Sequence, residues 1–331
     1  MDPERRALLA CPACGGALAA SWRCEGCGLA FEVVDGVPAL RLPGGERTEA
    51  VRDFYTETPF PNYPPEASLS WLRARASRSE FAQSLDAAIA PDARIVEIGC
   101  GTGQMSLFLA RGDRLVISAD LTRASLMLAA DAARRFGVRG VSFIETDLAR
   151  PALQPGAFDV VYCSGVLHHT PDPRRSFARI ARLARPGGMI VLGLYNAVAR
   201  LPLRLRRVTA RLTGERWIPF DPILRDRAGE PERRAAWLRD QYRHPEEHRH
   251  TLREVRRWFA ENGVSFVRSY PPVLGGEVAP ASLFAPEEDD WAFGDWLTQL
   301  GWMAALSQEG GLFVTVGQAG PNASAASAIA P

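Results

Sequence analysis

The stretch Ile95-Val-Glu97-Ile-Gly99-Cys-Gly101-Thr-Gly103-Gln104 decides the fold, because in it an apolar run ends in three alternating glycines. The apolar run predicts a buried strand, and the glycines predict a sharp turn directly before a helix. At such a turn the backbone lacks Cβ atoms and can approach a ligand closely. The stretch therefore predicts a strand, loop and helix of an α/β sheet, with a ligand site above the loop.

The chain after this loop alternates between short apolar segments and amphipathic segments. Such alternation is typical of a parallel sheet with helices on both faces. Two further strands follow after an interruption. The predicted strands are 94–98, 115–119, 141–145, 158–163, 189–194, 264–270 and 312–317, and the helices between the first five lie near 104–111, 122–136 and 174–184.

Length and composition limit the classes of protein to which the chain can belong. Of its 331 residues, 47% are hydrophobic and 23% are charged, which excludes a mainly disordered protein. The charges of the 39 basic and 38 acidic side chains nearly cancel. The protein could therefore bind a polyanion or an anionic membrane only through a local basic patch. All basic residues are arginine, which excludes Schiff-base chemistry on lysine. No signal or membrane-spanning segment is visible, so we expect a cytoplasmic protein without integral membrane association.

Changes in composition divide the chain into several parts. We predict a small cysteine-containing domain, a linker with a helical lid element, an α/β domain with two insertions, and a disordered tail. In that order the parts span 1–42, 43–90, 91–318 with insertions at about 197–250 and 271–310, and 319–331.

Four of the six cysteines form two pairs, Cys11-x2-Cys14 and Cys24-x2-Cys27, and a glycine follows each pair. Two such turns can direct four thiolates at one ion in a tetrahedron, which is the coordination of structural zinc. A redox dithiol or a rubredoxin-type iron site would also use such pairs. The spacing favours zinc, and a closed four-thiolate site would stabilise folding rather than perform catalysis.

Acidic residues accompany the first three predicted strands. Glu97 lies two residues before the first glycine, Asp120 ends the second strand, and Asp147 follows the third. Since the carboxyl ends of parallel strands meet at one edge of the sheet, these carboxylates are expected to converge near the glycine loop. An acid about twenty residues after the glycines can accept hydrogen bonds from both hydroxyls of a ribose, as it also does in dinucleotide-binding enzymes.

Two later segments, Phe158–His169 and Leu183–Met189, indicate which class of ribose-containing ligand the loop binds. Together with the GxGxG spacing they resemble the class I S-adenosylmethionine (SAM) dependent methyltransferases with a type 11-like core, over about residues 93–195. The resemblance implies a Rossmann-like, seven-stranded, mostly parallel sheet and an enzyme that transfers a methyl group from SAM. An NAD enzyme and a non-catalytic SAM-binding scaffold protein are the alternatives.

The resemblance also implies roles for single residues. The glycines would hold the methionine part of SAM, with Glu97 near its amine. Asp120 would bind the ribose, and Asp147 with Leu148 would recognise the adenine. The residues implied in cofactor binding are Glu97, Gly99, Gly101, Gly103, Asp120, Asp147, Leu148, Ser164 and Gly165.

The identity of the methyl acceptor depends on the residues after the fourth strand. Nucleic-acid enzymes that methylate amines use a tetrapeptide of the type Asn/Asp-Pro-Pro-Tyr there, and this chain has Ser164-Gly-Val-Leu167 instead. We therefore expect a small-molecule acceptor, with tRNA, rRNA or protein as the alternative. His168 and His169 are the nearest titratable groups and could act as a base, although such histidines also serve as packing or cofactor-side groups.

The segment from Leu8 to Pro38 resembles the zinc-ribbon module that serves as the small activator subunit of tRNA and translation-factor methyltransferases. Zinc ribbons can also grip nucleic acid. Residues 1–50, however, contain five basic and seven acidic side chains, so docking onto protein is expected instead.

Two clusters in the insertions have several interpretations. His244, His248 and His250 could lie at the solvated start of a helix, contact substrate or bind a metal. The second cluster is a basic amphipathic helix, which could be a surface helix with a solvated basic face, a grip on an anionic acceptor or a contact to a membrane surface. It combines Arg200, Arg204, Arg207 and Arg211 with Leu201, Leu205, Val208 and Leu212.

Overall fold

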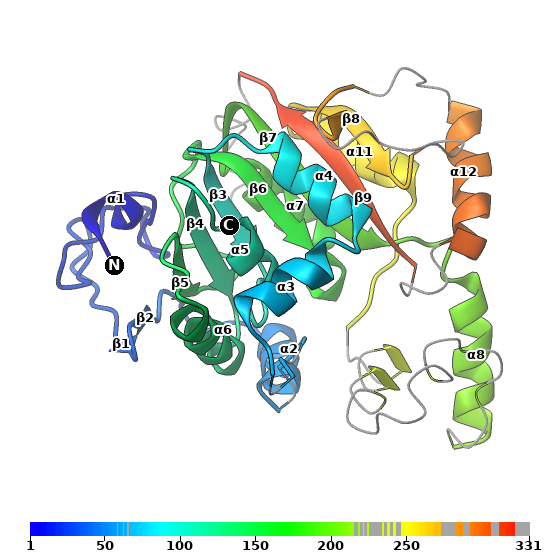
Figure 1. Ribbon diagram of the computed structural model, residues 1–331, viewed down its shortest axis with the longest axis horizontal. Coiled ribbons are helices and arrows are strands. Elements are labelled where there is room, and N and C mark those ends of the chain that lie inside the picture. Colours follow the sequence, from blue (N-terminus) through cyan, green and yellow to red (C-terminus); the bar gives the residue numbers. More distant parts are fainter. Residues whose placement is uncertain are drawn as a thin grey trace.

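Seven strands hydrogen-bond into one sheet in the computed structural model (Figure 1). The strands are β3 (Arg94–Ile98), β4 (Leu115–Asp120), β5 (Val141–Glu145), β6 (Phe158–Ser164), β7 (Ala184–Tyr195), β8 (Val264–Tyr270) and β9 (Leu312–Ala319). Their order across the sheet is β5-β4-β3-β6-β7-β9-β8. Strands β3 to β7 pair in parallel, and β9 pairs antiparallel with β7 and β8. The predicted Rossmann-like, mostly parallel sheet is confirmed.

The structure describes most of the chain. The described residues are 1–57, 59–61, 63–64, 66–214, 218, 221, 224, 234, 237–238, 241–242, 246–272, 282–286, 292–305 and 311–321. His244 lies outside them, and so does most of the predicted tail. Strand β9 continues to Ala319, two residues beyond its predicted end.

Helices cover both faces of the sheet. Alternate residues of β3 point to opposite faces, so Ile95 and Val96 are both fully buried but belong to different apolar clusters. The Ile95 cluster is shared with the helices α3 (Leu69–Ala76), α4 (Glu80–Ala88), α5 (Gln104–Leu109) and α6 (Arg123–Phe136). The Val96 cluster is shared with the helices α7 (Pro173–Ala181) and α11 (Leu252–Glu261).

Strand β7 shows the largest difference between predicted and observed bounds. It begins at Ala184 rather than at residue 189, because Ala184 pairs with Phe158 of β6 ahead of an irregularity in the ladder. The Pro-Gly-Gly sequence in this part suggested a turn. The remaining elements are α1 (Pro3–Arg6), β1 (Val33–Val34), β2 (Val37–Pro38), α2 (Glu46–Glu57), the 3-10 helix η1 (Leu167–His169), α8 (Leu201–Leu212) and α12 (Ala292–Ala305).

The N-terminal cysteine segment packs against the β5 edge of the large sheet (Figure 1, dark blue). Ala39 forms a parallel bridge with Glu145 of β5, and the backbone N–H of Ala10 donates to the carbonyl oxygen of Ala152 at 3.2 Å. Leu9 and Leu40 are buried in the same apolar cluster as the interior of the α/β part. The segment therefore docks onto its own chain.

Among the described helices, none has the length and apolar character needed to cross a membrane.

Candidate cofactor and active site

A cavity of about 740 Å³ lies where the parallel strands end at their carboxyl edge. Ligands of open α/β sheets bind at this edge, since the loops after the strands converge there. Eight of the nine predicted cofactor residues line the cavity. These are Glu97, Gly99, Gly101, Asp120, Asp147, Leu148, Ser164 and Gly165.

Gly103 has a different place from the other loop glycines, because it is not among the residues that line the cavity. Its φ is +78°, and a Cβ there would lie 2.9 Å from the Cβ of Ala129 in α6. Gly103 thus allows α5 to begin close against α6, and its predicted part in holding the cofactor stays a prediction.

Gly101 lies against the segment that precedes the α/β part. A Cβ at this position, where φ is +52°, would collide with the carbonyl oxygen of Phe60. The hydroxyl of Thr102 donates to the carbonyl oxygen of Pro61, and the hydroxyl of Tyr63 donates to the carbonyl oxygen of Thr102 at 2.8 Å. Phe60 and Pro61 also line the cavity, so the predicted lid element lies directly on the glycine loop.

Asp120 joins the glycine loop to the end of β4. One carboxylate oxygen accepts from the backbone N–H of Gly101 at 2.8 Å, and the other accepts from that of Thr122 at 2.8 Å. These bonds fix the carboxylate plane and leave acceptor capacity on both oxygens for ligand hydroxyls. Burial raises the pKa of Asp120, although the two N–H donors oppose that shift.

Glu97 is a buried acid with 6% of its surface exposed, and it lines the cavity. Its carboxylate accepts a hydrogen bond from the hydroxyl of Ser106 in α5. Burial raises the pKa of Glu97 to about 7, and the negative charge of Asp120 acts in the same direction. A cationic group in the cavity would therefore favour the ionised form of Glu97.

Asp147 follows β5 at the same edge of the sheet. It is 8% exposed, and its carboxylate accepts from the backbone N–H of Ala149 at 2.8 Å, which fixes the turn that carries Leu148. Three carboxylates from three neighbouring strands thus face a cavity whose other wall is glycine backbone.

His169 lines the cavity, and its Nδ1 lies 2.8 Å from the carbonyl oxygen of Glu246. A carbonyl oxygen only accepts, so Nδ1 carries the hydrogen and Nε2 carries the lone pair. Burial lowers the pKa of His169 to about 4. The neutral ring can therefore accept a hydrogen bond at Nε2 across the neutral pH range.

His168 is fully buried and is not among the residues that line the cavity. Its ring stacks on that of Tyr195 with centroids 3.8 Å apart, and its Nδ1 accepts from the backbone N–H of Tyr195 at 3.3 Å. This geometry suits a group that positions Tyr195 rather than one that touches a substrate.

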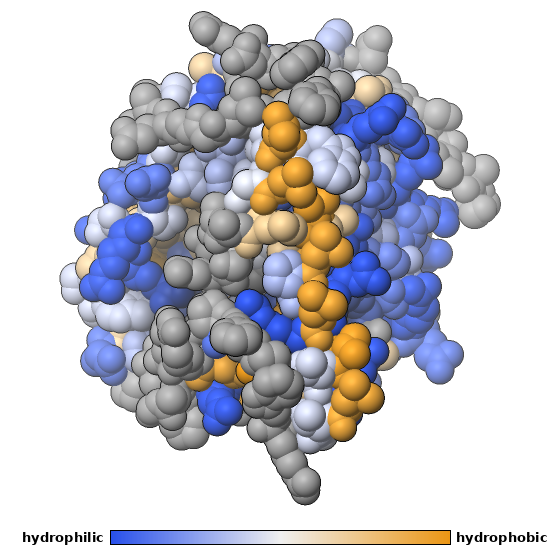
Figure 2. All heavy atoms as spheres, turned by 90° about the vertical axis from the view of Figure 1, so that its right-hand side faces the viewer, coloured by the Kyte–Doolittle hydropathy of each residue, from blue (hydrophilic) through white to orange (hydrophobic). Residues whose placement is uncertain are grey.

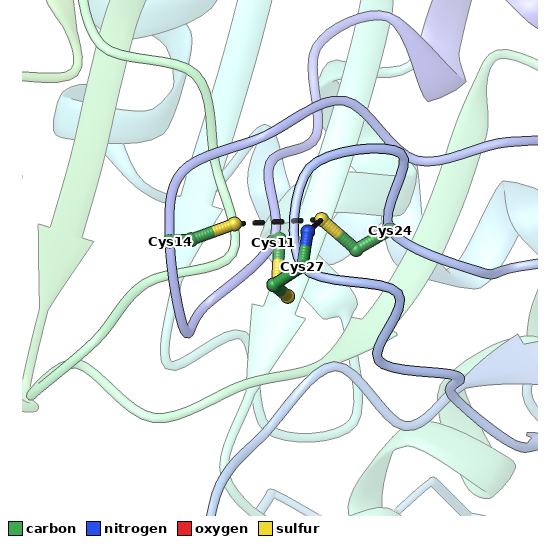
Figure 3. Close-up of side chains that lie close together, drawn as sticks. All are labelled: Cys11, Cys14, Cys24 and Cys27. Atoms are coloured by element: carbon green, nitrogen blue, oxygen red, sulfur yellow. Dashed lines mark hydrogen bonds between the residues drawn. The ribbon is translucent and has the colours of Figure 1, made fainter.

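The four cysteines of the N-terminal segment gather from two turns (Figure 3). All four sulfurs lie within 4.8 Å of one another. The distance is 3.7 Å between the sulfurs of Cys11 and Cys27 and 3.4 Å between those of Cys14 and Cys24. Tetrahedral zinc with bonds of about 2.3 Å requires sulfur–sulfur distances of about 3.8 Å, so the cluster fits zinc. The backbone N–H of Cys27 lowers the pKa of the Cys24 thiol to about 6, whereas burial raises the pKa of the Cys11 thiol.

Residues 96–192 match the protein-family profile described as "Methyltransferase domain". These residues therefore form a methyltransferase domain. The match begins within β3 and ends within β7, and it includes much of the lining of the cavity at the carboxyl edge.

Relatives of known sequence match parts of this chain. An uncharacterized protein of Synechococcus sp. is 29% identical over 248 residues, which are 66% of this chain and 59% of that protein. A ubiquinone biosynthesis O-methyltransferase of Ralstonia nicotianae is 39% identical over 108 residues, which are 32% of this chain and 45% of that protein. The chain thus spans 45% to 59% of the length of these two curated relatives.

Two solved structures are similar to this chain at low sequence identity. The magnesium protoporphyrin IX methyltransferase of Synechocystis with bound S-adenosylhomocysteine (SAH) is 16% identical, with a TM-score of 0.49 over 83% of this chain and 100% of that chain. The complex between the Haloferax volcanii Trm112 methyltransferase activator and a putative methyltransferase is 14% identical, with a TM-score of 0.47 over 84% of this chain and 100% of that chain.

Tyr195, at the end of β7, is a cavity residue that the sequence analysis did not predict. The Arg200 guanidinium lies 3.6 Å from the centre of its ring, on which His168 also stacks, and the side-chain amide of Gln241 donates to its hydroxyl at 2.9 Å. Arg200 and Arg207 both form ion pairs with Glu247, at 3.0 Å for Arg200. These contacts link residues that are far apart in the sequence, so no local sequence pattern predicts them.

The prediction that the four arginines of the row from Arg200 to Arg211 form a solvated face is wrong for two of them. Arg200 is only 1% exposed and lies just ahead of α8, and Arg207 is half-buried against Glu247. Arg204 and Arg211 are exposed as predicted. The buried pair is tolerated because Glu247 neutralises it.

The histidines of the insertion lie near acids. Nε2 of His248 lies 2.8 Å from a carboxylate oxygen of Glu246, and Nδ1 of His250 lies 3.0 Å from one of Glu254. Within the described part of the chain, the groups of residues able to hold a metal comprise the four cysteines and not these histidines.

Proposed function

We propose that this protein transfers a methyl group from SAM to a hydroxyl group of a small molecule. The observation that carries the proposal is the cavity of the methyltransferase domain, with glycine backbone on one wall and Glu97, Asp120 and Asp147 on the other. Bare backbone suits a bulky nucleoside ligand at close approach, and the carboxylates suit its hydroxyls and its amine.

SAM supplies a methyl group on a positively charged sulfur, and this charge is lost on transfer. The chain therefore mainly has to align the two reactants and exclude water. In this proposal Asp120 accepts hydrogen bonds from the ribose, Glu97 attracts the amine, and Asp147 with Leu148 holds the adenine. Ser164 and Gly165 border the reaction point.

A small acceptor with a hydroxyl group is supported by the chemistry around His169. Tyr55 and Tyr195 flank this histidine, with ring centroids 6.3 Å and 5.7 Å from it, so an apolar acceptor would find aromatic walls. The lone pair on Nε2 can accept the hydroxyl hydrogen as the methyl group is transferred. The O-methyltransferase relative acts in ubiquinone biosynthesis by its name, which is in keeping with a small acceptor.

The four cysteines are proposed to bind one structural Zn²⁺, as their geometry fits that ion. With four thiolate ligands the ion would have no free coordination position. It would therefore hold the two turns together and would not activate a substrate.

Extract labelling tests the proposed function. The protein is incubated with methyl-tritiated SAM and an extract, which is then separated into small molecules, RNA and protein. Label in the small-molecule fraction is the expected result. Label confined to tRNA, rRNA or protein would overturn the proposed acceptor class, and no transfer to any fraction would indicate a non-catalytic SAM-binding scaffold.

Substitution of His169 by glutamine is expected to lower the methyl-transfer rate about a hundredfold, because general-base assistance contributes on the order of 10² to 10⁴. Glutamine can still donate to the Glu246 carbonyl, so SAH affinity should change by less than about twofold. The rate is measured on the labelled small-molecule fraction, and His248→Gln is the matched control outside the cavity lining. An unchanged rate would remove His169 from the mechanism.

SAM affinity is expected to rise about tenfold between pH 6 and pH 8. Glu97 is mostly neutral at pH 6 and mostly ionised at pH 8, since its pKa is about 7, and only the carboxylate attracts the amine of SAM. Calorimetry across this range measures the slope. Glu97→Gln should bind SAM weakly and with a flat profile, whereas the same slope in that variant would assign the titration to another group.

A further inference from the structure

Helix α8 carries its apolar residues on two sides, and one of these sides faces outward. Leu203 and Ala210 are buried against the protein. A second row spaced by four, three and four residues is exposed along the whole helix. Its members are Leu201 at 42%, Leu205 at 71%, Val208 at 54% and Leu212 at 82% exposed.

Helix α12 extends this apolar row. Trp296, Leu297 and Leu300 are exposed by 60%, 45% and 38%. The two helices are connected near the start of α8, where the side-chain amide of Asn196 donates to Gln299 of α12 at 3.0 Å. Figure 2 shows a continuous orange band that runs down this side of the molecule. We call these seven residues the α8–α12 ridge. At about 1.5 Å per residue, two helices of 12 and 14 residues provide a long apolar surface, larger than scattered exposed residues would form.

Positive charge borders the α8 part of the ridge. Helix α8 contains four arginines and no acid. Arg204 and Arg211 are exposed, and neither forms an ion pair with any residue that the structure describes. Apolar side chains flanked by exposed arginines are the combination that binds the headgroup region of an anionic bilayer.

We infer that the α8–α12 ridge docks onto the surface of an anionic phospholipid membrane. A second copy of the chain is less suitable, because a two-fold contact along α8 would bring the same arginines of both copies close together. The chain's overall charge of +1 gives no general attraction, so the local arginines have to provide it.

The inner side of α8 connects this surface to the acceptor end of the cavity. The Arg207 guanidinium donates to the carbonyl oxygen of Gln241 at 2.7 Å, and Gln241 lines the cavity beside Tyr195. Docking through the outer side would therefore hold the acceptor end near the lipid phase. The inference itself concerns binding and does not depend on methyl transfer.

Vesicle flotation tests the inference with the full-length, zinc-loaded protein. The protein is expected to float with vesicles of phosphatidylcholine and phosphatidylglycerol at low salt, and less so at high salt or with phosphatidylcholine alone. Leu205→Gln with Leu212→Gln should weaken the vesicle binding about tenfold or more, since both side chains insert. Arg204→Gln with Arg211→Gln should remove the preference for the anionic vesicles.

Leu128→Gln is the matched control, because Leu128 is 41% exposed but lies on α6. SAH binding of every variant, measured by calorimetry, verifies that the fold is intact. Binding to neither vesicle, or equal binding of the double leucine variant, would overturn the inference. So would a wild-type dimer in light scattering that the double leucine variant converts to a monomer, since the ridge would then be an interface between copies.

Discussion

Replacement of Asp120 by alanine is expected to raise the dissociation constant for SAH about a hundredfold or more. Each hydrogen bond to a charged acceptor contributes about 1.5–3 kcal/mol, and the carboxylate has acceptor capacity for two ribose hydroxyls. At about 1.4 kcal/mol for each factor of ten, the loss of two such bonds corresponds to two or more orders of magnitude. Calorimetry with SAH measures this directly, because SAH has no methyl group to transfer.

Asp120→Ala is expected to weaken SAH binding through the glycine loop as well as through the ribose. Asp120 receives the backbone N–H of Gly101, so alanine leaves that N–H without its acceptor and loosens the wall of the cavity. Asparagine at this position would turn an amide donor toward either Gly101 or Thr122, so it should also bind SAH weakly. Asp131→Ala is the control, since Asp131 lies on α6 with 48% of its side chain exposed. Equal SAH affinity of Asp120→Ala and wild type would contradict the assignment of the ribose site.

The sheet and its acids could be predicted because local patterns determine them. Strands β3 and β5 have the predicted bounds, since short apolar runs between polar turns leave little choice of limits. The convergence of Glu97, Asp120 and Asp147 follows from parallel topology alone, as all strand ends then lie at one edge.

The acceptor side could not be predicted, because it depends on contacts between distant segments. Tyr195 lies between His168 and Arg200, and Arg200 is held by Glu247, which is 47 residues away. From spacing alone, a surface helix with a solvated basic face was one interpretation of the row from Arg200 to Arg211. Arg200 and Arg207 instead form ion pairs with Glu247, a residue that local spacing could not identify as their partner, and the leucine row is exposed.

The role of Gly103 could not be predicted from the spacing of the three loop glycines. The spacing of the loop gives all three glycines the same role, yet Gly103 serves the contact between α5 and α6. A ligand-facing glycine and a packing glycine look alike in sequence, because both satisfy a positive φ.

Removal of zinc is expected to unfold the N-terminal segment and to lower the melting temperature of the whole chain. The segment has only one two-stranded sheet, of two residues per strand, and a four-residue helix, so its own core cannot hold it. Structural zinc sites contribute about 10–16 kcal/mol of apparent binding energy, which is folding energy for such units. Cys24→Ser, or a chelator, should therefore produce protease cleavage within residues 1–42, and calorimetry should record the lower melting temperature.

Unfolding of the N-terminal segment is expected to disturb the cavity as well, because the segment pairs with the edge of the sheet. Ala39 pairs with Glu145 two residues before Asp147, so loss of the segment should also weaken SAH binding. Cys163→Ser is the matched control, since Cys163 is buried in β6 and remote from the cluster, and this variant should keep one zinc per chain. Metal analysis distinguishes the interpretations of the cysteine pairs. One zinc lost in Cys24→Ser supports a structural site, bound iron would indicate a rubredoxin-type centre, and a metal-free protein that melts like the wild type after chelation would leave a dithiol.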